Sequence, residues 1–392
     1  MKNSQNINPL VYNGHLYEGI ALIHNPDCNA GLSVLMTYAL NGIKQSLARN
    51  WLPVINFDNQ YNTFFYSPKH GENIWEYFWN PVMGLSYKDV EAHLKHGKIK
   101  PDQIKRFKSE DIFFWHTQDK ERIATFWLES NPVDPSIWMK EKRKLGRYYV
   151  KKFIDIKENI KEKASNFSKQ NFNNTFLFTV HIRGTDFSYA EPTNHKKYFK
   201  KIEEIIKRKN LQDYQVFLAT DQTQFVGLFK KHFGSKLITY NSARGSSFIA
   251  PFKLQQVDPY KKGEDVLIDI LLLSEGDHIL KCAASVGEYA TWFSNNIEIT
   301  DFALESRYVN NNHFLCKTGY EKLGFIENSH QITYTAARRW LSNYLELKVF
   351  KFKNDRNISN LQKAMFIVTY IISIIIREVR TLIKKIISLF SN

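Results

Sequence analysis

The sequence predicts an α/β protein of two Rossmann-like domains that face a cleft, with an amphipathic helical tail at the C-terminus. In both halves, apolar strand patterns alternate with helical patterns at the spacing of parallel sheets covered by helices. The chain has 392 residues, and 43% of them are hydrophobic, so it can form more than one large core. A polar, lysine-rich helical pattern separates the halves. We assign the domains to residues 1–170 and 171–345, and the tail to 346–392.

The first half opens with a strand at 19–23, a helix at 32–48 and a strand at 51–57. The polar pattern between the halves reads as one helix, from about Pro135 to Lys169. The second half is a longer alternation, with strands at 175–182, 214–219, 236–240 and 277–282 and helices at 195–209, 223–233, 265–275 and 286–294. Ligands of open α/β sheets bind beyond the carboxyl ends of the strands. We therefore expect the functional residues where these strands end.

The formal net charge of +15 is concentrated in the tail, because residues 348–392 carry nine Lys or Arg and only two acidic residues. A basic excess in an apolar tail, rather than interleaved with aromatics on the domains, argues against nucleic-acid binding. Cys28, Cys282 and Cys316 are too far apart for a disulfide framework or a zinc spacing, which favours a reducing compartment. The N-terminus has no secretory signal pattern. We therefore expect a cytoplasmic protein.

The tail contains AMFIVTYIISIII, residues 364–376, without a charge. As a helix this run is about 20 Å long, shorter than the roughly 30 Å of a hydrocarbon core. In the residues that follow, Arg380, Lys384 and Lys385 fall opposite an apolar face. The pattern predicts that residues 360–392 lie on an anionic membrane surface. A helix packed on the protein body is a serious alternative, and a tilted span is the least favoured one.

The stretch FLFTVHIRGTDF, residues 176–187, is an apolar strand that ends in His181, Arg183 and Asp186. The planar fork of Arg183 is suited to two phosphate oxygens at once. Asp186 would orient that arginine, and His181 would contact a ribose or a base. The alternative is an ordinary salt bridge between Arg183 and Asp186, which this short motif alone does not exclude.

Asp269 lies in the apolar run DVLIDILLL. A buried carboxylate without a partner is costly, so a partner is expected. It is either a neighbouring arginine or backbone group, or a ligand ring that presents two adjacent N–H donors, as guanine does.

Two further strand ends lead into helices. In KCAASVGEYATWF, Ser285 and Glu288 have the spacing of a capping box, and the helix start offers N–H groups and a positive dipole end to an anion. Ordinary capping is the alternative. In ATDQTQ, Thr220 and Asp221 would also face the cleft. For Asp221 a turn and cap role is favoured.

Several known motifs are absent from the sequence. It has no D-x-D pair, so a metal-dependent nucleotide-sugar site of that type has no visible ligands. It has no P-loop, no G-x-G-x-x-G and no G-x-S-x-G. We therefore expect no metal and no dinucleotide cofactor.

Three blocks of the second half, in order and spacing, resemble the fucosyltransferases that use GDP-fucose: HIRGTDFSYAEPTNHKKYF, VFLATDQTQ and GEDVLIDILLLSEGDHILKCAASVGEYA. The likeness is closest to the α1,6-fucosyltransferases and nodulation-factor fucosyltransferases, in a superfamily that includes protein O-fucosyltransferases. It covers about residues 173–295 and is weak over 1–170. The resemblance implies a GT-B-type architecture that works without a metal.

The resemblance also implies roles for single residues. Arg183 corresponds to the arginine on the donor β-phosphate, and His181 and Asp269 to the residues that hold the guanosine. Ser285 corresponds to a serine that donates to the phosphate. Glu191 falls where the α1,6 enzymes place a carboxylate proposed as the general base.

Three positions depart from the family pattern. Where the α1,6 enzymes have the second of two consecutive arginines, this chain has Gly184. Where they have a lysine after the aspartate, it has Phe187. The residue after the phosphate-binding serine, which can be polar in the family, is Val286. The donor is therefore better supported than the acceptor or the linkage.

The resulting hypothesis is a transfer of fucose from GDP-fucose, with inversion, to a glycan hydroxyl. The acceptor would lie against the aromatic N-terminal half and could be lipid-linked, and loop 241–263 would act as a lid. One rival is transfer from another GDP-sugar, and the other is a non-catalytic glycan- or lipid-binding protein on the same fold.

Overall fold

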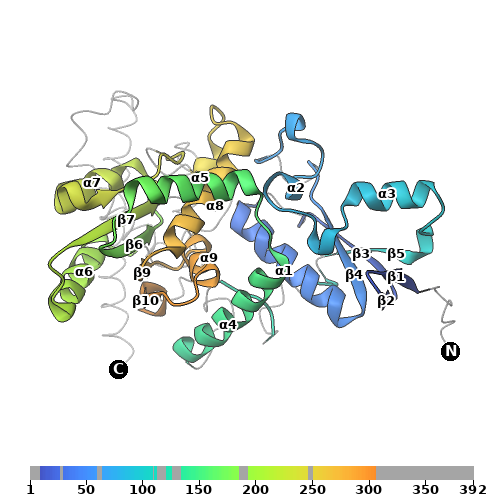
Figure 1. Cartoon of the computed structure of the whole chain (residues 1–392), viewed down its shortest axis with the longest axis horizontal. Coiled ribbons are helices and arrows are strands. Elements are labelled where there is room, and N and C mark those ends of the chain that lie inside the picture. The colour runs from blue at the N-terminus through green and yellow to red at the C-terminus, as the bar shows by residue number, and fades with distance from the viewer. Residues whose placement is uncertain are drawn as a thin grey trace, which may run out of the picture.

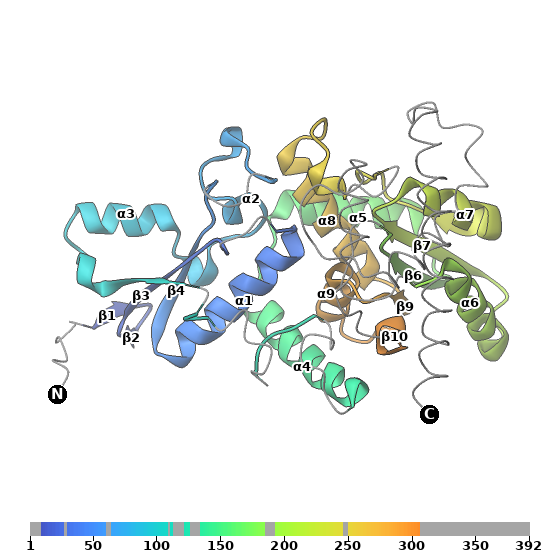
Figure 2. The same ribbon diagram turned by 180° about the vertical axis from the view of Figure 1, so that it is seen from behind.

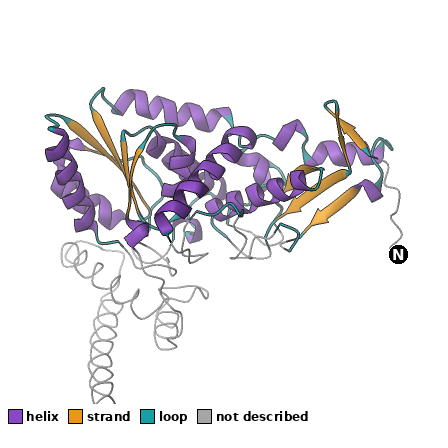
Figure 3. Cartoon of the chain, turned by 90° about the horizontal axis from the view of Figure 1, so that it is seen from below, coloured by secondary structure: helices purple, strands orange, loops and turns teal. Residues whose placement is uncertain are grey.

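A computed structural model describes residues 9–26, 30–59, 64–108, 110–112, 121–125, 134–184, 193–245 and 250–305. Two parallel sheets lie toward opposite ends of this part of the chain, with helices between them (Figures 1 and 3). The predicted α/β fold with parallel sheets is therefore confirmed. The tail, 346–392, lies outside the described residues.

The sheet of the first half has the strand order β4-β3-β5. β3 (Gly19–His24) is its central strand, and α1 (Leu32–Ala48) leads from it to β4 (Trp51–Asn56). β5 (Ile104–Phe107) pairs with the other edge of β3. The predicted elements at the start of the chain are thus present. A small antiparallel hairpin of β1 (Leu10–Tyr12) and β2 (His15–Tyr17) precedes them.

The sheet of the second half has five parallel strands in the order β10-β9-β6-β7-β8. The strands are β6 (Phe176–Ile182), β7 (Tyr214–Thr220), β8 (Leu237–Ile238), β9 (His278–Lys281) and β10 (Glu298–Asp301). Alternate residues of β6 face opposite sides, as a strand requires. Phe178, Val180 and Ile182 pack against α6 (His195–Lys209) and α7 (Thr223–Phe233).

The other face of this sheet is covered by α8 (Pro259–Ser274) and α9 (Ser285–Phe293). Thr179 of β6 donates to the carbonyl of Leu273 in α8 at 2.9 Å. α5 (Glu158–Asn171) joins this layer, since the Phe167 ring lies 5.1 Å from the Tyr240 ring. Figure 2 shows α5 behind α8 in the view from the back.

The remaining helices are α2 (Trp75–Phe78), α3 (Tyr87–Lys95) and α4 (Pro135–Phe153). Short 3-10 helices lie at Pro68–His70, Val82–Gly84, Pro101–Gln103, Gly234–Lys236, Pro251–Lys253 and Phe302–Glu305. Among the helices of the described ranges, none has both the length and the apolar character that a membrane crossing requires.

Two helix predictions are wrong. The pattern 135–169 is two helices, because the backbone of residues 154–157 hydrogen-bonds outside a helix: Asn80 donates to the Asp155 carbonyl, and Lys157 donates to the Phe78 carbonyl. α8 begins at Pro259, not at residue 265. Its N-cap Asp258 accepts from the N–H groups of Tyr260 and Lys261, and proline suits the first helical position.

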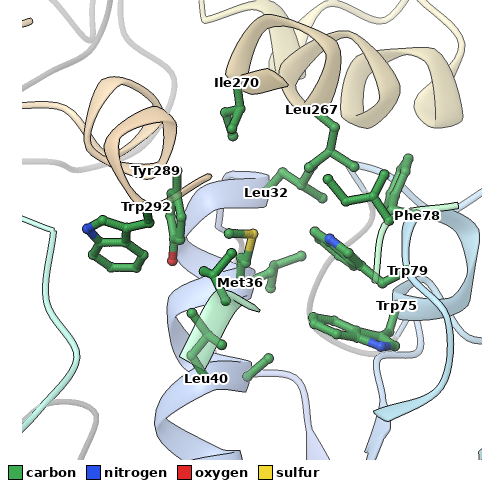
Figure 4. Close-up of a cluster of buried hydrophobic side chains, with 14 of the residues drawn as sticks. Leu32, Met36, Leu40, Trp75, Phe78, Trp79, Leu267, Ile270, Tyr289 and Trp292 are labelled. Atoms are coloured by element: carbon green, nitrogen blue, oxygen red, sulfur yellow. The ribbon is translucent and has the colours of Figure 1, made fainter. Parts of the chain in front are cut away.

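α1 lies between the two sheets and is buried from both sides. In Figure 4, the aromatic side chains of α2 and Trp79 approach it from one side, and Tyr289 and Trp292 of α9 approach from the other. The buried hydroxyls of Thr37 in α1 and Tyr289 share a hydrogen bond. One hydrophobic core thus extends from the first sheet to the second, and it fixes α9 against the first half of the chain.

Candidate functional site

The strand order of the second sheet reverses at β6. The chain builds outward from β6 through β7 to β8, and then returns to add β9 and β10 on the other side. Open α/β sheets bind ligands outside the carboxyl ends of the strands at such a switch point. The residues that follow β6 and β9 are therefore the candidate site.

Arg183 follows β6 directly and meets Asp221, which follows β7. The two strands are in register, with Ile182 opposite Thr220. Arg183 Nε lies 3.7 Å from Asp221 Oδ2, and Asp221 Oδ1 accepts from the Gly184 N–H at 2.9 Å. Both side chains are largely buried, at 24% and 17% exposed. Asp221 therefore orients the arginine and also fixes the turn after it.

The side chains around position 184 leave room only for a glycine. A Cβ atom at this position would lie 2.1 Å from Gln222 Oε1 and 2.5 Å from the ring of Phe225. Gln222 and Phe225 are both buried, so neither can move aside freely. The structure gives a steric reason for a glycine where the resembled enzymes have a second arginine.

α9 begins at the carboxyl end of β9, beside β6. Its N-cap is Ala284, with no side-chain hydrogen bond to the helix start, and Ser285 is the first helical residue. The predicted capping box is therefore wrong, because Glu288 is held by other partners. The N-cap side chain therefore does not occupy the first N–H groups of α9, and free helix N–H groups suit an anion. Ser285 Oγ lies 2.9 Å from Thr125 Oγ1 of the first half.

His181 lies beneath the first turn of α9. A Cβ atom on Gly287 would lie 2.9 Å from His181 Nδ1, so the helix approaches the strand as closely as a glycine allows. Cys282 Sγ is 3.9 Å from the same nitrogen. Burial, with the charges of Arg183 and Lys281, lowers the pKa of His181 to about 3. The imidazole is therefore neutral at physiological pH and is suited to hydrogen bonding rather than to carrying charge.

A buried ion network lies behind α9. Arg143 of α4 donates from Nε and Nη2 to the two carboxylate oxygens of Glu288 at 2.9 Å each, and it also pairs with Asp301. Lys281 Nζ lies 3.0 Å from both Glu288 and Asp301. Burial would lower the pKa of Lys281, but the carboxylates of Asp301 and Glu288 more than offset this and raise it. Two cations and two anions thus tie α4 to β9, α9 and β10.

Asp269, on α8, is 9% exposed and accepts from Ser242 Oγ at 2.9 Å. Burial raises its pKa to about 7, against the opposing effects of the Arg244 charge and the Ser242 hydrogen bond. Arg244 is held by the carbonyl oxygens of Tyr240 at 2.6 Å and Ser242 at 3.3 Å. Asp269 therefore has one serine donor and one arginine charge nearby, and these do not fully offset the effect of burial on its pKa.

Residues 240–245 link the two parts of the site. Gly245 donates to the Asp221 carbonyl at 2.9 Å, and Ala243 donates to Asp265 Oδ2 at 2.8 Å. This segment therefore joins the end of β7 to the acidic face of α8. Residues 246–249 of the predicted lid lie outside the described residues, so the lid stays a prediction.

The structure brings Arg183, His181 and the α9 start at Ser285 to one edge of the sheet, together with the end of β7. Thr220 is buried, and its Oγ1 accepts from the Gln222 N–H at 3.3 Å, which is a turn role. Asp186 and Glu191 lie outside the described residues. Sequence reasoning missed Thr125, Arg244 and the partners of Glu288, because their contacts join segments far apart in the chain.

In the parts of the chain that the structure describes, no three His, Cys, Asp or Glu side chains are grouped to hold a metal ion.

No family model matches the chain, and no curated protein matches it. Solved structures do. NodZ fucosyltransferase from Bradyrhizobium is 12% identical, with a TM-score of 0.43 over 74% of this chain and 99% of that one. A mutant of Arabidopsis thaliana FUT1 in complex with GDP is 8% identical, with a TM-score of 0.43 over 72% and 70%. POFUT1 in complex with GDP is 10% identical, with a TM-score of 0.42 over 73% and 99%.

The class of enzyme that the sequence motifs resemble is thus also found among the solved structures similar to this chain.

Proposed function

We propose that the chain is an inverting, metal-independent glycosyltransferase that transfers fucose from GDP-fucose to a glycan hydroxyl. The two sheets would be the Rossmann-like domains of a GT-B-type enzyme. One observation carries the proposal: Arg183, paired with Asp221, follows β6, and the start of α9 follows the neighbouring strand β9, at the switch point of the sheet. A fork of guanidinium donors and a row of helix N–H groups, at the ends of two adjacent strands, suit a diphosphate.

The chemistry follows from the charge that develops as the sugar leaves. The acceptor oxygen bonds to the anomeric carbon of fucose as the bond between this carbon and the β-phosphate oxygen breaks, and the departing GDP gains negative charge. Arg183 and the α9 N–H groups stabilise this charge without a proton transfer or a metal. Glu191 would take the proton of the acceptor hydroxyl, and Asp186 would support the arginine.

Asp269 would recognise the guanine base by hydrogen bonding. Its carboxylate, once ionised, can accept from both N1–H and N2–H of guanine, and Ser242 already holds one of its oxygens. His181 lies near the same strand ends as a neutral ring. The acceptor would be a glycan, and a lipid-linked one would agree with a tail that binds a membrane surface.

Arg183→Ala tests the proposal directly. Loss of one transition-state donor costs about 100- to 1,000-fold in rate, so we expect a loss of that size in GDP release from GDP-fucose with acceptor, from a protein that still folds and unfolds cooperatively. Arg208→Ala, on the exposed end of α6, is the matched control and should keep full activity. An Arg183→Ala enzyme that turns over normally would remove Arg183 from the site.

The donor can be ranked separately. Thermal shifts with GDP, UDP and CMP report the base, and product masses with GDP-fucose and another GDP-hexose report the sugar. Shifts that do not favour GDP would contradict the base assignment, and binding of GDP with no turnover of any donor would favour the non-catalytic alternative.

A further inference from the structure

α4 carries an exposed face that the ion network does not use. Its inner face is formed by Met139, Lys142, Gly146, Val150 and Phe153, which are buried against the body of the protein. In Figures 1 and 2 the helix lies along the lower edge of the molecule, on the side opposite α5. At 3.6 residues per turn, the outer face is formed by Ile137, Lys140, Glu141, Lys144, Tyr148, Lys151 and Lys152. We call these seven residues the outer face of α4.

The outer face is strongly basic, and its charges are not compensated by ion pairs with other described residues. Lys140, Lys144, Lys151 and Lys152 are exposed, and Glu141 is the single acidic residue among the seven. No carboxylate of the described residues pairs with any of the four lysines, whereas Lys161 and Lys163 of the next helix are both paired. The four charges therefore remain available to a partner.

The same face exposes apolar surface. Ile137 is 60% exposed and Tyr148 is 54% exposed, and both are among the most exposed large hydrophobic residues of the described part of the chain. They are eleven residues apart, which is three helical turns, so they share one side of α4. Lysines with long apolar stems lie between and beyond them.

We propose that the outer face of α4 lies on an anionic lipid surface, independently of the tail and of the proposed reaction. A helix face of lysines with an aliphatic and an aromatic side chain is the composition that binds at the interface of such a bilayer. Ile137 enters the boundary between head groups and acyl chains, Tyr148 lies at head-group level, and the lysines contact lipid phosphates. The face is about 22 Å long.

Charge chemistry favours lipid over nucleic acid. All four cations are lysines, which act as mobile point charges, and none is an arginine, whose fork suits geometrically defined phosphates. An exposed isoleucine gains nothing from a phosphate backbone but gains from a bilayer boundary.

Lysine footprinting of the full chain tests this contact. The protein is labelled with an amine-reactive ester, alone and with vesicles of 70% phosphatidylcholine and 30% phosphatidylglycerol, and labelling is read by mass spectrometry. We expect at least threefold protection of Lys140, Lys144 and Lys151. Lys207 on α6 and Lys230 on α7, which are also exposed and unpaired among the described residues, should be unchanged. If the protein sediments with the vesicles while the α4 lysines stay as reactive as these controls, the proposal is overturned.

A double variant gives an independent measurement. Each lysine at an anionic surface contributes roughly a fivefold gain in partition, so Lys144→Gln with Lys151→Gln should weaken vesicle binding about 25-fold, and Lys207→Gln with Lys230→Gln should not. Equal losses in the two variants, equal binding to pure phosphatidylcholine, or no vesicle binding at all would overturn the proposal. The proposal would also be overturned if double-stranded DNA protected the α4 lysines from labelling more strongly than vesicles did. That result would assign the outer face of α4 to nucleic-acid binding.

Discussion

The buried carboxylate of Asp269 lowers the free energy of unfolding of the protein at neutral pH. Burial raises its pKa to about 7, above the roughly 3.9 of an unfolded chain. Between these values the folded state holds a proton that the unfolded state has released. Stability therefore falls as pH rises from about 4 to about 7, and the penalty stays in place above that range.

Asp269→Asn should make the protein more stable and a poorer binder of GDP. We expect the free energy of unfolding to rise by about 2–4 kcal/mol at pH 8, and little at pH 4, because asparagine carries no charge to desolvate. GDP affinity should fall at least about tenfold, since asparagine replaces one of the two acceptor oxygens with an NH2 donor, which cannot pair with an N–H of guanine. Urea unfolding at both pH values and calorimetry with GDP measure the two effects.

Asp102→Asn, at an exposed position of the first half, is the matched control and should change neither quantity. A destabilised Asp269→Asn protein at pH 8 would contradict the raised pKa, and undiminished GDP binding would contradict the base-reading role.

At the scale of elements, the position of α9 depends on four buried charges. Arg143 and Lys281 balance Glu288 and Asp301, and the side chains of Lys281 and Glu288 have no solvent exposure. Trp292 Nε1 also donates to Glu288, at 3.2 Å. The glutamate thus joins α4, β9 and α9 at one point, directly behind the helix start that faces the proposed diphosphate.

Glu288→Gln should unbalance this network. Removal of one partner leaves a buried cation without compensation, which costs about 3–5 kcal/mol. We expect a loss of that size in urea unfolding, and a higher KM for the donor because the α9 start shifts. Glu298→Gln, at a half-exposed pair with Lys209, should cost less than about 1 kcal/mol. If the two variants were equally stable, Glu288 would not be needed to balance the buried charges of Arg143 and Lys281.

Elements with a strong local pattern could be predicted from the sequence. The helix at 32–48 has the expected bounds, and β6, β7 and β9 lie within one residue of theirs, because an apolar period or an apolar run determines them locally. β8 is shorter than expected, and β10 was not predicted. The break between α4 and α5 could not be predicted, since it depends on hydrogen bonds to residues 78–80. The capping box failed for a similar reason: Glu288 meets two cations that the local sequence does not contain.

The site shows the same division. The parallel-strand rule predicts that Arg183, Asp221 and Ser285 follow strands of one sheet, and the structure places the ends of those strands together. The rule does not predict that Thr125 or Arg244 belongs to the site. Both residues lie on loops, and other parts of the chain position those loops.

At the scale of the molecule, α1 makes one core of the two halves. Side chains of α1, α2, α8 and α9 belong to a single hydrophobic cluster, and Gly146 of α4 lies so close to Trp292 that a Cβ atom would be 2.4 Å from its ring. Movement of one half against the other would therefore open the core itself.

We expect a single cooperative unfolding transition for the described body of the protein. Trp292→Ala should lower the free energy of unfolding by about 3–5 kcal/mol. Both sheets should then unfold together, at a lower urea concentration than in the unchanged protein. Hydrogen exchange of β3 and β6 amides, followed against urea, measures each half in one experiment. Trp138→Ala, which alters a half-buried tryptophan on α4, should have a smaller effect. Two separate transitions, with only the second-half sheet displaced, would contradict a shared core.

The contact between α4 and α9 also has a consequence for synthesis. α4 leaves the ribosome well before α9 exists, with a delay on the order of ten seconds at ordinary elongation rates. During that interval Arg143 has neither of its carboxylate partners, and the surface around Gly146 has no tryptophan to cover it. The packing of α4 on the rest of the molecule is therefore completed only after Trp292 has been synthesised.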